Sequence, residues 1–258
     1  MTLEEQKACM DPLQTAGLLI MENGGETFRV EETITRMGRA FGLENVESFA
    51  VPSGLFISYR MTDGTVETSV KRVRRGGSNL TRVDWVNGVS RRVEQEKLTP
   101  TETMAELKKA EGLALPEWMI PLGAGVCAAG FTWMFGGGGP EVLVSFLTAL
   151  AVQLGDLGLG RLHFRSQVSV LLSSLVTALL PMLLTLVLPG LGTEAIIGGA
   201  LMPMLPGLTM TNAVQDMMRG DMVSGLSHGM QALLTAALVA GGALMADTLF
   251  RFATRGGL

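Results

Sequence analysis

Four polar residues in one short stretch have the types and spacing of a ligand-binding site: Thr209, Thr211, Asn212 and Asp216. Asn212 and Asp216 are four positions apart, which places both side chains on one face of a helix. Hydroxyl and amide side chains cap helix starts, and the free N–H groups of a helix start attract anions. We therefore predict that these four residues bind a substrate. Plain helix capping, with Gln215 three residues after Asn212, is the alternative.

A helix break directly precedes these residues. Pro203, Pro206 and Gly207 interrupt an apolar stretch, and a proline inside a helix removes a backbone donor and clashes with the preceding turn. In lipid the freed backbone groups find no water, so such a break persists only beside protein or a polar cavity. Broken membrane helices of this kind hold substrate sites in secondary transporters. The sequence therefore predicts a transport site at this break.

Three further titratable residues are candidates for proton coupling: Asp156, Asp221 and His228. Ionisable side chains inside a membrane are costly and often functional, and histidine exchanges protons near neutral pH. Asp156 is nevertheless better explained as a loop charge, and a single membrane histidine more often forms a hydrogen bond with a neighbour. For Asp216, a solvated charge beside Arg219 and a functional acid are equally good interpretations.

Several classes of site are not supported by the sequence. Cys9 and Cys127 fall in different regions, so they form neither a disulfide framework nor a metal motif. The chain has no Walker-type phosphate loop, no H-E-x-x-H zinc motif and no Gly-x-Ser-x-Gly nucleophile motif. We therefore expect no cofactor, no metal and no nucleic-acid partner. A membrane-anchored hydrolase is the weaker alternative, because both histidines lie in the C-terminal half.

Charge divides the chain into two regions. Residues 1–116 hold 15 Lys/Arg and 17 Asp/Glu, whereas residues 117–258 hold only 5 and 7. The first region is predicted to be a soluble α+β domain with two helices, a small antiparallel sheet and two more helices. Its strands are expected at 46–51, 55–59 and 65–73, where β-branched and aromatic residues gather. Residues 1–30 carry scattered acids and no apolar core of a secretory signal, so we expect this domain in the cytoplasm.

The second region, residues 117–258, is predicted to be an α-helical membrane domain. The predicted fold class is thus an α+β soluble domain followed by about five transmembrane helices, the fourth of them broken. The spans are expected near residues 118–135, 141–155, 166–188, 195–218 (the broken one) and 222–250. Four glycines in this region are predicted to mark close helix contacts rather than hinges: Gly198, Gly199, Gly241 and Gly242.

Three stretches resemble the threonine/serine exporters (ThrE), and the match is closest to the YjjP-like component of the split form. One stretch is Gly24-Gly25-Glu26-Thr27 with the helix that follows. Another runs from Asn87 through Arg91-Arg92-Val93 to Leu98-Thr99-Pro100. The most specific stretch is Met202-Pro203-Met204-Leu205-Pro206-Gly207, followed by Thr211-Asn212-Ala213, Asp216, Gly220-Asp221 and Ser224-Gly225.

The resemblance covers nearly the whole chain and implies a function. It implies export of small carboxylate metabolites, threonine and serine for fused members and dicarboxylates such as succinate for a split pair. It also implies coupling to the proton-motive force across a bacterial inner membrane. This chain has one soluble domain and one membrane half, so a smaller YjjB-like membrane subunit is the expected partner, within a higher oligomer in the lipid bilayer. A scaffold whose partner carries out the transport is the alternative.

Overall fold

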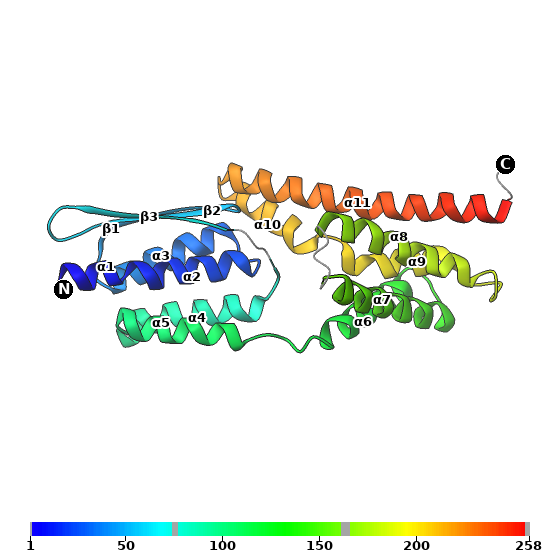
Figure 1. Cartoon of the computed structure of the whole chain (residues 1–258), viewed down its shortest axis with the longest axis horizontal. Helices are drawn as coiled ribbons and strands as arrows, with labels where there is room; N and C mark the ends of the chain where they lie inside the picture. Colours follow the sequence, from blue (N-terminus) through cyan, green and yellow to red (C-terminus); the bar gives the residue numbers. More distant parts are fainter. Residues whose placement is uncertain (1, 74–76, 161–165, 256–258) are drawn as a thin grey trace. The chain divides into compact units, whose positions relative to one another are not determined.

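The computed structural model describes residues 2–73, 77–160 and 166–255. The chain forms two compact units, and neither is a continuous segment (Figure 1). The first unit joins Met1–Ala114 to Leu208–Met230, and the second joins Leu115–Gly207 to Gln231–Leu258. A stretch from late in the sequence is therefore part of the N-terminal unit.

Five helices make up most of the N-terminal segment. They are α1 (Leu3–Ala8), α2 (Met10–Glu22), α3 (Thr27–Ala40), α4 (Leu80–Glu96) and α5 (Pro100–Lys108), with a 3-10 turn at Lys109–Gly112. The amphipathic pattern of α3 places Val30, Ile34 and Met37 on one face, and all three are fully buried. These side chains join the core of the unit, which also includes residues of α2, α4 and the sheet.

A three-stranded antiparallel sheet completes this segment. Its strands are β1 (Glu44–Val51), β2 (Gly54–Arg60) and β3 (Val66–Arg72), in the order β1-β2-β3. The turn between β2 and β3 contains Asp63 and Gly64, and Gly64 has a φ of 86°, which glycine adopts without strain. The inward side chains Leu55, Ile57 and Tyr59 are buried. The Tyr59 hydroxyl donates to the backbone oxygen of Gln6 at 2.8 Å, which ties the sheet to α1.

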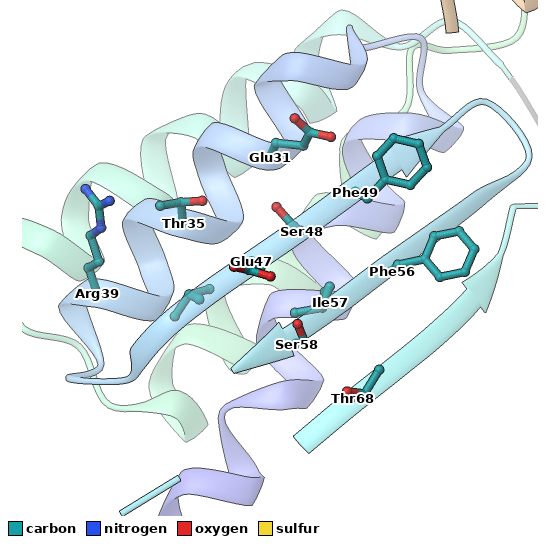
Figure 2. A pocket seen from close by; sticks show the side chains of 11 residues that line it. Glu31, Thr35, Arg39, Glu47, Ser48, Phe49, Phe56, Ile57, Ser58 and Thr68 are labelled. Atoms are coloured by element: carbon teal, nitrogen blue, oxygen red, sulfur yellow. The ribbon is translucent and has the colours of Figure 1, made fainter. Parts of the chain in front are cut away.

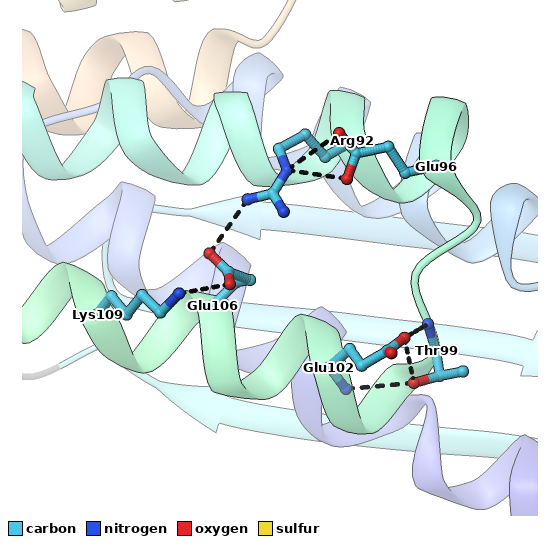
Figure 3. Close-up of polar contacts among 6 residues, drawn as sticks. All are labelled: Arg92, Glu96, Thr99, Glu102, Glu106 and Lys109. Carbon is cyan, nitrogen blue, oxygen red and sulfur yellow. Dashed lines mark hydrogen bonds and ion pairs between the residues drawn. The ribbon is translucent and has the colours of Figure 1, made fainter.

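Helices α4 and α5 are joined by polar contacts at the surface (Figure 3). Thr99 caps α5, since its side chain accepts from the backbone N–H of Glu102 and the Glu102 side chain accepts from the backbone N–H of Thr99. The Thr-Pro-Thr-Glu sequence suits this start, with a capping residue, a proline at the first helical position and an acid in the first turn. Arg92 of α4 bridges to Glu106 of α5, with Nη1 and Oε2 3.1 Å apart. The pKa of the Glu106 carboxyl is lowered by its hydrogen bonds to Lys109 and Arg92.

The second unit is built from apolar helices. They are α6 (Met119–Met134), α7 (Gly139–Gly160), α8 (Ser166–Leu184), α9 (Thr193–Leu201) and the larger part of α11 (Met222–Arg255). Helix α6 packs against α7 and α9, and α8 packs against α7 and α9. Among the described residues, three helices are long and apolar enough to cross a membrane: Gly139–Gly158, Gln167–Leu184 and Met222–Thr254. Helix α6 is apolar but shorter, with 16 residues, or about 24 Å against a hydrocarbon core of about 30 Å.

The predicted fold class is wrong in its membrane part, because the described residues do not form five spans. The predicted broken span at 195–218 consists of α9, a 3-10 turn at Met202–Met204 and α10 (Gly207–Met218). Helix α9 belongs to the second unit, whereas α10 is part of the N-terminal unit from Leu208 onward. The small sheet is the only sheet in the described part of a largely helical chain. The physical reason is that α10 is a short helix with a polar buried face, which an average hydropathy over 195–218 hides.

The prediction that glycines mark close helix contacts is confirmed at two positions. A Cβ on Gly199 would lie 2.5 Å from the backbone nitrogen of Thr132, and a Cβ on Gly242 would lie 2.6 Å from the backbone oxygen of Leu171. Neither backbone atom can rotate away as a side chain can. Helices α6 and α9, and helices α8 and α11, therefore approach each other as closely as glycine permits.

Replacing Gly242 with alanine is expected to destabilise the second unit by about 1–3 kcal/mol, because the added methyl overpacks the α8–α11 contact. Thermal unfolding of the purified chain in detergent measures this loss. Gly241→Ala is the matched control, since a Cβ there would meet only the Leu171 side chain, at an ordinary 3.8 Å. Equal unfolding temperatures for the two variants would contradict the close contact.

Candidate functional site

Within the N-terminal unit, one narrow face of helix α10 is buried. Asn212, Ala213 and Asp216 are buried, at positions i, i+1 and i+4 of the helix. The Asn212 side chain donates to the backbone oxygen of Gly24 at 3.2 Å. Asn212 therefore fixes α10 to the turn before α3.

Asp216 is the centre of the site. Its side chain is 0% exposed, and it accepts a hydrogen bond from the Thr27 hydroxyl at 2.8 Å. Its other oxygen lies 2.9 Å from Nδ1 of His228. Thr27 is the first residue of α3, so the carboxylate also lies beside the positive end of a helix dipole. The group is thus buried but fully paired, as a buried acid must be.

A second carboxylate shares the same hydroxyl. Asp221 Oδ2 lies 3.2 Å from the Thr27 oxygen, and Asp221 Oδ1 accepts from the backbone N–H of Ser224 at the start of α11. One hydroxyl proton therefore serves two carboxylates, one from each side of the α10–α11 turn. We call Thr27, Asp216, Asp221 and His228 the Asp216 cluster. The cluster thus brings two carboxylates and one imidazole together around a single hydroxyl.

Two more contacts attach the α10–α11 turn to the N-terminal segment of the same unit. The Arg219 guanidinium lies over the Phe28 ring, with Cζ 3.5 Å from the ring centroid. The buried Ser224 hydroxyl donates to the backbone oxygen of Ala50 on β1 at 3.3 Å. Because α3 and β1 hold both ends of the turn, the Asp216 cluster is positioned by elements that lie far away in sequence.

Glu31 of α3 senses the charge of the cluster. Burial raises the pKa of its carboxyl, and the negative charges of Asp221 and Asp216 raise it further, while a hydrogen bond from the Ala50 N–H at 3.0 Å acts in the opposite direction. A raised pKa means that the folded state favours the protonated form of the Glu31 carboxyl over the ionised form.

This shift predicts a pH dependence of stability. Because the folded pKa of Glu31 is higher than its ordinary value of 4.5, its stabilising contribution is complete below that value and is lost as pH rises through the folded pKa. Glu31→Gln keeps the acceptor for Ala50 but cannot ionise. We expect the unfolding temperature of Glu31→Gln, relative to that of the unaltered chain, to increase as pH rises from 4 to 7. Parallel curves for the two proteins would contradict the shift.

A separate polar contact lies inside the second unit. Asp156 of α7 accepts hydrogen bonds from the hydroxyls of Ser169 and Ser173 on α8. The Ser169 bond is 3.0 Å long. Asp156 falls within the apolar segment Gly139–Gly158, one of the three candidate spans. It is thus an acid in an apolar helix whose partners come from the neighbouring apolar helix.

The structure brings together some of the predicted site residues and separates others. Asp216, Asp221 and His228 form one cluster, and Asn212 lies next to it on the same face of α10. Thr209 is half-buried and Thr211 is exposed, so Thr211 lies off this face. The three residues of the predicted helix break lie in the connection between α9 and α10. Pro203 is in the 3-10 turn, Pro206 follows the extended Leu205, and Gly207 begins α10.

Sequence reasoning missed three partners of the acids. Thr27, Ser169 and Ser173 were not among the predicted site residues, although all three donate to an acid. The Gly-Gly-Glu-Thr motif before α3 was the available signal for Thr27. For the two serines, their spacing of four on an apolar helix was the signal, because it places both hydroxyls on one face.

An open groove of about 580 Å³ lies elsewhere on the N-terminal unit, beside α3 and the sheet (Figure 2). Glu31, Thr35 and Arg39 of α3 line one side, and the strands line the other. Phe49 and Phe56 extend from neighbouring strands, and their ring centroids are 6.1 Å apart. Its charged lining mixes both signs. Within residues 2–73, 77–160 and 166–255, no group of His, Cys, Asp or Glu is arranged to hold a metal ion.

Apolar helices long enough to cross a membrane, together with a folded unit that holds a buried acid–histidine pair, are typical of a membrane transport protein. Comparison with known families agrees. The chain belongs to the threonine/serine exporter family (ThrE), whose sequence model matches residues 13–250. This family assignment confirms the resemblance seen in the motifs.

Two curated relatives extend over nearly the same length. One, from Escherichia coli K12, is named "Probable succinate transporter subunit YjjP"; it is 26% identical over 251 residues, which cover 97% of this chain and 98% of the relative. A protein of the same name from Klebsiella aerogenes is 27% identical over 247 residues, which cover 95% of each chain. No solved structure matches the chain.

Proposed function

We propose that this chain is one subunit of a secondary-active exporter of small carboxylate metabolites, driven by the proton-motive force. Its place is the bacterial inner membrane, with the N-terminal region, residues 1–116, in the cytoplasm. A smaller YjjB-like membrane subunit is the proposed partner. The family assignment and the relatives' names as transporter subunits support the exporter role and the need for a second subunit.

The observation that carries proton coupling is the pairing of Asp216 with His228. The acid is fully buried, its oxygen lies 2.9 Å from the imidazole nitrogen, and the Thr27 hydroxyl holds its other oxygen. A proton that arrives at this pair can reside on either group without leaving the hydrogen bond. Binding or release of that proton changes the net charge beside Asp221 and Glu31, and this change is the proposed link between protonation and the α10–α11 turn.

The charge of Asp216 affects which substrates can bind near it. An ionised Asp216 repels a dicarboxylate and attracts the ammonium group of threonine or serine. Protonation of Asp216 would remove this repulsion for succinate and this attraction for an ammonium group. Thr209, Thr211 and Asn212 are the proposed contacts for the substrate carboxylate, because neutral donors on α10 suit an anion.

Everted membrane vesicles test this function directly. Vesicles that contain this chain and the partner subunit are energised, so that their interior is acidic, and uptake of labelled succinate, threonine and serine is measured. We expect uptake of one of them only when both subunits are present, and its loss when an ionophore collapses the proton gradient. Uptake that survives the ionophore would overturn proton coupling. No uptake of any of the three, with both subunits assembled, would overturn the exporter assignment.

A second candidate is a scaffold role, in which the partner alone forms the path. The bond from Asn212 to the Gly24 backbone favours it, because a residue committed to holding α10 is not free to bind substrate. Asn212→Ala separates the two functions. Loss of uptake with intact assembly supports a lining role, and full uptake with intact assembly supports the scaffold.

A further inference from the structure

The two edges of the small sheet are treated differently by the fold. At the β1 edge, the Ala50 N–H donates to Glu31 of α3 at 3.0 Å, and the Ala50 oxygen accepts from Ser224 of α11 at 3.3 Å. Side chains from two helices therefore occupy this edge. At the other edge, β3 pairs with β2 alone in the part of the chain that the structure describes.

The backbone groups along the open edge can be assigned from the hydrogen bonds at the two ends of β3. The Thr65 oxygen accepts from Met61 and the Val73 N–H donates to Ser53, so the odd-numbered residues direct their backbone groups toward β2. The even-numbered residues direct theirs outward. They are Val66, Thr68, Val70 and Arg72, of which Val66 is 58% and Val70 is 61% exposed. An open edge with two exposed valines is a template for another strand.

We propose that β3 pairs with β3 of a second copy of this chain, antiparallel and centred on Ser69, to form a continuous six-stranded sheet. In this register Thr68 lies opposite Val70 of the second copy, and both have outward backbone groups, so they exchange two hydrogen bonds. Ser69 faces its own counterpart as a pair without backbone hydrogen bonds, with Cα atoms about 4.5 Å apart.

Charge selects the second copy as the occupant. Around a two-fold axis at Ser69, Glu67 lies opposite Lys71 of the second copy, and Lys71 lies opposite Glu67 of the second copy. Two ion pairs form between directly opposed side chains. A register centred on Thr68 places Glu67 opposite Ser69 and makes no ion pair. In an isolated chain the same lysine would instead keep strands apart, which is the usual protection of an edge.

Cysteine crosslinking of the full chain in its native membrane tests the register. Ser69→Cys is expected to give a covalent dimer under mild oxidation, because a separation of about 4.5 Å lies within the range of a disulfide. Val66→Cys is the matched control. It is more exposed than Ser69, which is half-buried, but the two copies of this position lie far apart in the proposed register. The unaltered chain, with Cys9 and Cys127, gives the background. No dimer with Ser69→Cys, or equal dimer with both variants, would overturn the pairing.

Charge reversal tests the choice of partner. With Ser69→Cys as the background, Glu67→Lys should lower the yield of dimer by roughly 2- to 30-fold, since two attractive pairs become repulsive. Adding Lys71→Glu restores both pairs in reversed order and should restore the yield. A double variant as poor as the single one would rule out this register. The readout is oligomeric state, so the result does not depend on the proposed transport activity.

Discussion

Replacing Asp216 with asparagine is expected to lower proton-driven uptake in everted vesicles by at least about tenfold, a loss of about 1.4 kcal/mol in the transport barrier. Asparagine has the same shape and can still accept the hydrogen bond from Thr27, but it cannot take up or release a proton. The Asp216 side chain is 0% exposed, so bulk solvent does not reach it to replace this function. The measurement is the initial rate of labelled substrate uptake, normalised to the amount of folded protein.

Two variants of Thr27 provide the controls for this result. Thr27→Ser keeps the hydroxyl that holds Asp216 and Asp221, so it should transport close to normally. Thr27→Val has a similar shape without the hydroxyl, and it leaves the buried Asp216 and the half-buried Asp221 with one donor fewer. We expect lower uptake with Thr27→Val and a shifted pH profile. Normal, proton-dependent uptake by Asp216→Asn would exclude the Asp216 cluster from coupling.

Replacing Asp156 is expected to have the second large effect. Asp156→Ala should reduce uptake by at least about tenfold if the acid carries charge through the apolar helices. The fold should survive, because the freed hydroxyls of Ser169 and Ser173 can bond to carbonyls one turn earlier in α8. Asp156→Asn then separates charge from hydrogen bonding. If Asp156→Asn transports as well as the unaltered chain, Asp156 is a structural acceptor only.

Much of the N-terminal unit could be predicted because its signals are local. The Asp63-Gly64 turn, the Thr99 cap and the apolar face of α3 each depend on residues within a few positions of one another. Their energies are set by backbone geometry and helical spacing, which a single sequence displays directly. All three features are present in the structure.

The location of α10 could not be predicted in this way. Thr27 and Asp216 are separated by 189 positions, and no local pattern says which distant helix start will receive an acid. The apolar average over 195–218 favoured a membrane helix, although the face that matters contains Asn212 and Asp216. A polar face that is satisfied by another element looks, in sequence, like a polar interruption of a span.

The β1 edge can be fully covered only late in synthesis of the chain. Its two caps come from Glu31, which is made before the strand, and from Ser224, which is made long after it. About 90 residues separate Ala114 from Leu208, so at roughly 5–20 residues per second the ribosome needs about 5–20 s to deliver the missing piece. During that interval the N-terminal segment has emerged without α10 and without Ser224 at the start of α11, and half of the Ala50 edge is open. The nascent chain is therefore most exposed to mispairing while the helices of the second unit are being inserted.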